Sequence, residues 1–418
     1  MNIIINAIKI LFLLGFLVTI HEAGHFFVAK FFKIKVNEFA IGFGPTIWKK
    51  NSKETKYALR LIPLGGFVNL EGEDGKSNEP GSFSNASIFQ KICVLIAGGT
   101  VNIIFGLIVF FFVMTATGGY VSTTIEELSE GYNAINSGLQ IGDEILKINN
   151  KRVRTIDDIN EIMSNSSGEE VAVLVKRNDE KKYINVLPTK IDIKQTGIYL
   201  DGENTKEATI VQVNEKSPAE EAGLTIGDVI IKINDIATEG NPQKVSEIIN
   251  KENDDVLEFL IKRNDEEITI KVVPETVSRY YLGIKFEVAD DNLATKMYYS
   301  LFETEDLLVN LVDNFKMLFT GRIKADQLMG PVGISSVVSS TKNINEYIYI
   351  IAIISISLGT TNLIPFPPLD GGKILLLIIE AIKRKPLKEE TDLAIQTLGF
   401  LILIALSIYV TFNDIIRI

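Results

Sequence analysis

The sequence contains two histidines, and both lie in the segment His21-Glu22-Ala23-Gly24-His25. Residues four positions apart share one face of an α-helix, so the two imidazoles can bind a single zinc ion. A glutamate directly after the first histidine can act as a general base that activates a water molecule. The pattern therefore predicts a hydrolytic zinc site. The alternative is a pair of core histidines whose hydrogen bonds are satisfied and which bind no metal.

The helix that must carry these histidines is strongly apolar. Residues 3–20 form a nearly unbroken apolar run whose one charged residue is Lys9. Ionisable groups inside such a run are costly in a bilayer, and they therefore indicate a functional site. Four runs are long enough to cross a membrane, at about 3–29, 92–116, 346–366 and 394–412. We therefore expect a polytopic α-helical membrane protein with four transmembrane helices.

Charge and cysteine content narrow the functions that the chain can have. The net charge is −11, which argues against a protein that coats nucleic acid. The single cysteine, Cys93, excludes an internal disulfide and a cysteine-based zinc site. Lysine and arginine are concentrated at 30–60 and 373–388, so the positive-inside rule makes both segments cytoplasmic. The segment from about 118 to 345 is then outside, and the histidines lie toward the cytoplasmic face.

The segment between the second and third spans contains an internal repeat. Residues 137–149 (SGLQIGDEILKIN) match residues 222–234 (AGLTIGDVIIKIN). Residues 175–180 similarly match residues 261–266. A period of about 85 residues is too long for a solenoid and fits two copies of a small domain.

The repeated pattern resembles the PDZ domain, which binds an extended peptide as an added strand. We expect two inserted α+β PDZ-like domains, at 118–195 and 196–280. The resemblance implies capture of peptide C-termini or restriction of substrate size. The peptide groove of the second copy is expected near 197–200, whereas that of the first copy is harder to place. The alternative is a spacer that binds no ligand.

The third metal ligand has to come from elsewhere in the chain. A catalytic zinc site needs three protein ligands, and the chain has no histidine or cysteine to spare, so a carboxylate is required. Asp370 stands out because it follows the proline-rich stretch 362–369 (NLIPFPPL) after the third span. Prolines prevent regular helix, and non-helical backbone at membrane depth needs protein or a water-filled cavity around it. The alternative is that Asp370 only caps the helix from Gly371.

Together these motifs are similar to those of the site-2 protease family of intramembrane zinc metalloproteases. The likeness is to the bacterial branch with two PDZ domains, the regulator-of-sigma-E type. It implies that His21, His25 and Asp370 bind Zn²⁺ and that Glu22 activates water. The family usually has a proline where Gly99 stands, so we expect a different local bend there.

The resemblance also implies how a substrate is held. Asn362, Pro365 and Pro367 would contact its backbone. Residues 39–45 and 57–68 are typical of two strands, which in the family form a membrane-associated β-sheet. A substrate paired to the edge of that sheet would be held extended, with one carbonyl presented to the metal. A plain amphipathic hairpin is the alternative.

The expected organisation has membrane segments on both sides of the PDZ pair. Residues 1–117 carry two spans and the cytoplasmic β region, and residues 281–418 carry a juxtamembrane helix, two spans and Asp370. The resemblance implies an endopeptidase of the bacterial cytoplasmic membrane that cuts transmembrane segments of single-span proteins. An anti-sigma factor or a signal-peptide remnant would be such a substrate.

Two functions of other classes compete with this interpretation. A metal-dependent transporter would have more polar residues across its spans and inverted repeats, whereas the repeat here is in the soluble part. A catalytically inactive scaffold that uses its PDZ pair for assembly would not require Glu22 between the histidines.

Overall fold

The chain folds into two compact units in a computed structural model. The first unit comprises Met1–Gly118 and Asp291–Ile418, and the second comprises Gly119–Asp290. The structure describes the whole chain except residues 1, 53, 74, 76, 201–206, 215, 253, 320–328, 342, 386 and 418. It does not describe the side chains of residues 2–4, 64, 313–316, 318–319 and 416–417.

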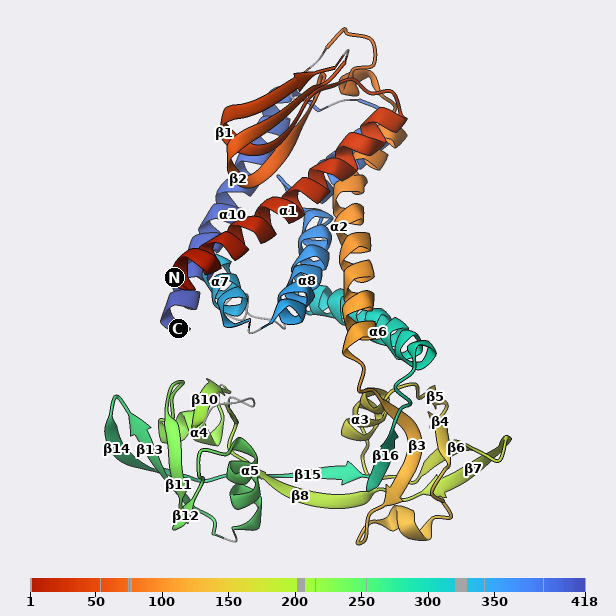
Figure 1. Ribbon diagram of the computed structural model, residues 1–418, viewed down its shortest axis with the longest axis vertical. Helices are drawn as coiled ribbons and strands as arrows, with labels where there is room; N and C mark the ends of the chain where they lie inside the picture. The colour runs from red at the N-terminus through yellow and green to blue at the C-terminus, as the bar shows by residue number, and fades with distance from the viewer. Residues whose placement is uncertain are drawn as a thin grey trace. The chain divides into compact units, whose positions relative to one another are not determined.

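Apolar helices dominate the first unit. Four of them are long and apolar enough to cross a membrane, as expected. They are α1 (Asn2–Phe31), α2 (Ile88–Thr117), α8 (Ile344–Asn362) and α10 (Glu389–Arg417). The other helices of the unit are α6 (Leu293–Phe319), α7 (Pro331–Ser340) and α9 (Asp370–Lys383). The central helix is α2, which packs against α1 and runs beside α8 (Figure 1).

Glycines let α2 approach its neighbours closely. A Cβ atom at Gly99 would lie 2.7 Å from the carbonyl oxygen of Gly359 in α8. On the other side, a Cβ atom at Gly24 of α1 would lie 2.6 Å from the carbonyl oxygen of Ala97. Small residues at such contacts allow close helix packing in membranes. The helix continues unbroken through Gly99, where the family usually has a proline.

A long β-hairpin follows α1. Strands β1 (Val36–Asn51) and β2 (Lys56–Leu70) pair antiparallel, and both contact α1. They extend beyond the expected ranges 39–45 and 57–68 at both ends. Several apolar side chains of the hairpin are exposed, including Trp48 at 53% and Leu61 at 60%. An exposed apolar surface of this kind marks contact with lipid or another apolar partner.

In the residues that the structure describes, the second unit contains two six-stranded sheets and a separate two-stranded ribbon. The first sheet consists of β16 (Ile284–Val288), β3 (Val121–Leu128), β4 (Glu144–Ile148), β6 (Val171–Arg177) and β7 (Glu180–Val186), with β5 (Lys151–Arg152) beside β4. The second consists of β14 (Glu266–Val272), β13 (Leu257–Arg263), β11 (Val229–Ile233), β10 (Ala208–Val213) and β9 (Ile198–Leu200), with β12 (Ile236–Ala237) beside β11. The ribbon pairs β8 (Thr189–Gln195) with β15 (Glu275–Tyr281). The helices are α3 (Ile156–Ser164), α4 (Pro218–Ala222) and α5 (Pro242–Lys251).

The sequence repeat corresponds to a repeated structural feature. Arg177 donates to the buried carboxylate of Asp143 from Nε at 2.7 Å and to the carbonyl of Gly138 at 2.8 Å. Burial opposes charge on Asp143, but the Arg177 hydrogen bonds and the backbone N–H of Gln140 outweigh it, so the pKa lies below its usual value. The second copy repeats this arrangement with Arg263, Asp228 and Gly223.

One expected boundary differs from the structure. Strand β16 follows the whole second copy in sequence, yet it pairs with β3 at the edge of the first sheet. The second copy is therefore inserted into the first, and residues 118–195 do not complete the first sheet. The unit ends at Asp290, beyond the boundary expected at 280, because β16 pairs with β3 and not with the membrane segments.

Candidate metal centre and peptide grooves

His21, His25 and Asp370 come together in the first unit. The Nε2 atoms of His21 and His25 lie 3.1 Å apart, and Oδ2 of Asp370 lies 3.1 Å and 3.3 Å from them. Ligand atoms bound tetrahedrally to zinc at about 2.0–2.1 Å are separated by about 3.3–3.4 Å. The three atoms therefore fit one zinc ion, and both imidazoles are almost completely buried.

The position of Asp370 argues against a role that is limited to helix capping. Asp370 is the first residue of α9, and the N-cap is Leu369, which has no side-chain capping bond. The carboxylate points to the histidines. A Cβ atom at Gly372 would lie 2.5 Å from the carbonyl carbon of Phe366, so this glycine lets the proline-rich loop fold tightly against α9.

Helix α2 completes the surroundings of the histidines. Nδ1 of His25 lies 2.8 Å from the carbonyl oxygen of Val94, which can fix the orientation and tautomer of the ring. A Cβ atom at Gly98 would lie 2.5 Å from Nε2 of His25 and 2.7 Å from Cε1 of His21. Sequence reasoning missed Val94, whose contribution is a main-chain oxygen. The pair Gly98-Gly99 was the sequence signal that α2 could approach the histidines closely.

Glu22 is held by the hairpin. Its Oε2 atom accepts a hydrogen bond of 3.0 Å from the backbone N–H of Val68 in β2. Because this N–H is directed to Glu22, it faces away from β1, and among the described residues β2 has no strand partner on that side. The glutamate is partly exposed and directly follows a histidine of the cluster. Glu22 therefore has the setting of a positioned base, and Val68 was not foreseen.

The three residues expected to contact substrate lie in or next to the loop between α8 and α9. Asn362 is the last residue of α8, Pro365 is exposed and Pro367 is partly buried. Pro367 packs against Gly399 of α10. Among the described residues no hydrogen bond joins Asn362 to the histidine and aspartate cluster, so its role stays a prediction.

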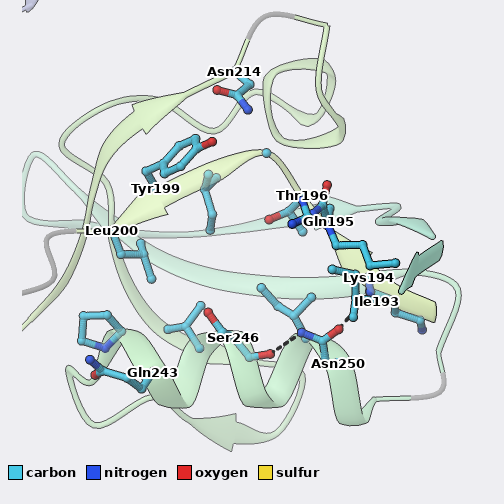
Figure 2. A pocket seen from close by; sticks show the side chains of 16 residues that line it. Ile193, Lys194, Gln195, Thr196, Tyr199, Leu200, Asn214, Gln243, Ser246 and Asn250 are labelled. Atoms are coloured by element: carbon cyan, nitrogen blue, oxygen red, sulfur yellow. Dashed lines mark hydrogen bonds between the residues drawn. The ribbon is translucent and has the colours of Figure 1, made fainter. Parts of the chain in front are cut away.

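The second unit contains a groove at the position expected in the second copy. A cavity of about 640 Å³ lies between β9 and α5. Figure 2 shows Tyr199 and Leu200 on the strand side and Gln243, Ser246 and Asn250 on the helix side. Strand β9 is the edge strand of its sheet, so one side of its backbone is open to an added strand.

The first copy has an equivalent groove of about 650 Å³. Helix α3 forms one wall, and residues 277–284 and Phe286 form the other. Gly283 and Ile284 correspond to Gly197 and Ile198 of the second copy. This groove was hard to place from sequence because its wall comes from residues that follow the second copy.

The chain is similar to known proteins over nearly its whole length. The model of peptidase family M50 matches residues 9–406. Regulator of sigma E protease of Haemophilus influenzae is 27% identical, with 96% of each chain covered. Zinc metalloprotease RasP of Oceanobacillus iheyensis is 29% identical, with 99% of each chain covered. Protease RseP of Yersinia pestis is 26% identical, with 100% of each covered.

Two similar solved structures cover part of the chain. The HtrA3 PDZ domain bound to a phage-derived ligand is 18% identical and covers 22% of this chain and 92% of its own, with a TM-score of 0.19. The HtrA-type protease AlgW with a decapeptide is 11% identical and covers 28% of this chain and 53% of its own, with a TM-score of 0.20.

Proposed function

The chain belongs to peptidase family M50, and from this premise we propose that it is a zinc endopeptidase that cuts peptide bonds within membrane-spanning segments. Its relatives are zinc metalloproteases, so Zn²⁺ is its metal. The observation that carries the proposal is the cluster of His21, His25 and Asp370, with zinc-compatible spacing, between helices apolar enough to cross a membrane.

The chemistry follows from these residues. His21, His25 and Asp370 would hold the zinc ion, which supplies Lewis acidity and lowers the pKa of a water molecule to about 7. Glu22 takes a proton from the attacking water and passes it to the leaving amine. The N–H of Val68 holds the Glu22 carboxylate at 3.0 Å and leaves its other oxygen for this transfer.

The hairpin offers a way to present the substrate. A transmembrane helix hides its peptide groups in internal hydrogen bonds, so it must be unwound before hydrolysis. Glu22 lies at the unpaired edge of β2, where its carboxylate accepts the hydrogen bond from Val68. A substrate segment that pairs with this edge would be extended beside the base. Asn362, Pro365 and Pro367 would contact its backbone from the loop before Asp370.

The second unit would control which substrates reach the site. We assign both modules to the PDZ class on the repeated Gly-Asp motif, the Asp–Arg pairs and the two grooves. The positive-inside rule puts this unit outside the cytoplasm and the metal centre toward the cytoplasmic face. The unit would restrict access by bulky ectodomains and bind peptide C-termini, so the substrates are single-span proteins already shortened outside.

Reconstitution tests the proposal directly. Purified protein in liposomes is given a single-span substrate with a short ectodomain, and cleavage and zinc content are measured. Cleavage should require zinc and should be lost in His21→Ala. Zinc bound without cleavage of any transmembrane substrate would favour a transporter or scaffold.

Deletion of residues 119–290 tests the role of the second unit. It should allow cleavage of a substrate with a bulky ectodomain while Glu22 remains essential. Loss of cleavage of the short substrate, with zinc and fold retained, would instead make the unit a recruiting module.

A further inference from the structure

Three buried side-chain atoms of α1 and α2 have no hydrogen-bond partner in the described part of the chain. They are Nδ1 of His21 and both side-chain atoms of Asn102, Oδ1 and Nδ2. Asn102 is completely buried in α2. Its main-chain carbonyl already accepts a bond of 2.8 Å from Ser355 Oγ, so the side-chain amide is the group that needs a partner. Leaving a buried polar group unpaired destabilises the folded state.

The two histidines differ in this respect. A metal-binding histidine normally donates its second ring N–H to an acceptor, which orients the ring and strengthens the bond to the metal. His25 has such an acceptor in the carbonyl of Val94. The buried Nδ1 of His21 has no acceptor among the residues that the structure describes. A complete site therefore requires an acceptor for His21.

The register between α1 and α2 places Asn102 at the required height. The two helices are antiparallel, because the residues of α2 that make the contacts rise in number as their partners in α1 fall in number. These contacts join His25 to Val94, Gly24 to Ala97 and Phe16 to Phe105. Asn102 lies one helical turn beyond Gly98, which packs against both imidazoles. It is therefore opposite the turn of α1 that precedes His21.

The directions of the side chains bring the two groups toward each other. Helical side chains tilt toward the N-terminus of their own helix. His21 thus tilts toward the turn opposite Asn102, and Asn102 tilts back toward Gly98. We propose that Asn102 positions His21, with Oδ1 accepting the Nδ1–H through one bridging water molecule. This inference rests on the proposed role of His21 as a zinc ligand.

Three variants of the full-length protein in detergent separate this hydrogen bond from packing. Asn102→Leu has a similar volume and removes the acceptor, whereas Asn102→Asp keeps an acceptor. The matched control, Ser355→Ala, removes a hydrogen bond at the same helix contact and leaves the amide in place. Zinc affinity is measured by competition with a chelator, and folding is checked by thermal unfolding. The d–d spectrum of the Co²⁺-substituted protein reports the ligand geometry.

The expected result is about 10- to 100-fold weaker zinc binding in Asn102→Leu, with a changed Co²⁺ spectrum. Asn102→Asp and Ser355→Ala should resemble the wild type. Wild-type zinc affinity in Asn102→Leu would overturn the inference, and so would equal weakening in all three variants, which would point to packing. If Asn102→Leu does not fold, Asn102→Asp decides by itself, because weak zinc binding in that folded variant overturns the inference. A wild-type protein that binds no zinc would instead contradict the proposed function.

Discussion

Neighbouring residues of one helix make separate contacts in this site. His21 and His25 turn their Nε2 atoms to Asp370, which comes from a helix more than three hundred residues later in the chain. Glu22 lies between them in sequence, but its carboxylate is bound by Val68 of the hairpin. Metal binding and proton transfer are therefore assigned to different side chains, and substitutions should separate them.

Glu22→Gln should lower cleavage by about 10²- to 10⁴-fold, because glutamine is nearly isosteric but cannot carry the proton. Zinc content should stay at the wild-type level. Cleavage of a single-span substrate and metal analysis of the same preparation provide the two measurements. Activity close to the wild type would remove Glu22 from the mechanism.

Asp370→Ala should reduce the zinc content, because two histidines alone leave the metal with too few protein ligands. Metal analysis after gel filtration is the measurement. Asp392→Ala, at an exposed position in the first turn of α10, is the matched control and should retain zinc. Full zinc in Asp370→Ala would require another carboxylate as the third ligand.

At the scale of elements, backbone groups of the hairpin and of α2 position residues of the site. The edge of β2 holds Glu22 through Val68, and α2 can come close to the histidines because Gly98 has no side chain. In the second unit, each sheet is joined to the turn before its central strand by an arginine bound to a buried aspartate. These contacts can be tested by changes that remove one atom or one charge.

Val68→Pro should reduce cleavage and leave zinc content unchanged. Proline removes the N–H that binds Glu22, and an unpaired edge position tolerates it because no ladder hydrogen bond is lost. Val68→Ala keeps the N–H and is the control. Equal activity of the two variants, measured on the same substrate, would show that the hairpin does not position the base.

Arg177→Met should destabilise the first module by about 3 kcal/mol, because it leaves the carboxylate of Asp143 buried without its partner. Lys176→Met is the control, because Lys176 pairs with the largely exposed Asp179 and should contribute at most about 1 kcal/mol. Hydrogen exchange of β4 and β6 in the full-length protein measures both effects. Equal protection in the two variants would contradict the prediction.

The lowered pKa of Asp143 also sets a pH dependence. The charged form is favoured in the folded state, so its contribution is present above the ordinary pKa of about 4. It is lost as the pH falls through the lower, folded value. Protection of β4 should therefore fall below about pH 4 in the wild type, and less steeply in Arg177→Met.

At the scale of the whole molecule, the chain is a multi-pass membrane protein whose second unit interrupts the membrane segments. This unit contains two modules, one inserted into the other, and its chain enters and leaves within the first sheet. Both ends of the second unit therefore belong to the first module. The proposed orientation of the unit rests on the charges of the loops in the first unit.

The proposed orientation can be tested with cysteine labelling in a Cys93→Ser background. A cysteine at Asn178, exposed in the second unit, should react with an impermeant maleimide in intact spheroplasts. A cysteine at Ser52, in the turn of the hairpin, should react only after permeabilisation. The opposite pattern would reverse the topology and the side of the membrane that the site faces.

The sequence by itself determined the local features of this protein. The histidine spacing, the four apolar runs and the repeated Gly-Asp pattern are periodic or short-range, so each can be recognised without knowledge of the fold. Asp370 could also be selected, because the chain has no histidine or cysteine to spare and carboxylates at membrane depth are few. The contacts of Asn362, Pro365 and Pro367 with substrate stay predictions.

Only the tertiary structure decided which distant backbone groups meet the site. The N–H of Val68 and the carbonyl of Val94 have no sequence signature, because every residue except proline carries both groups. The pairing of β16 with β3 was equally hidden, since a short strand can join any open edge of matching register. For this reason the boundary at 280 was placed too early, and the groove of the first module was found only in the folded chain.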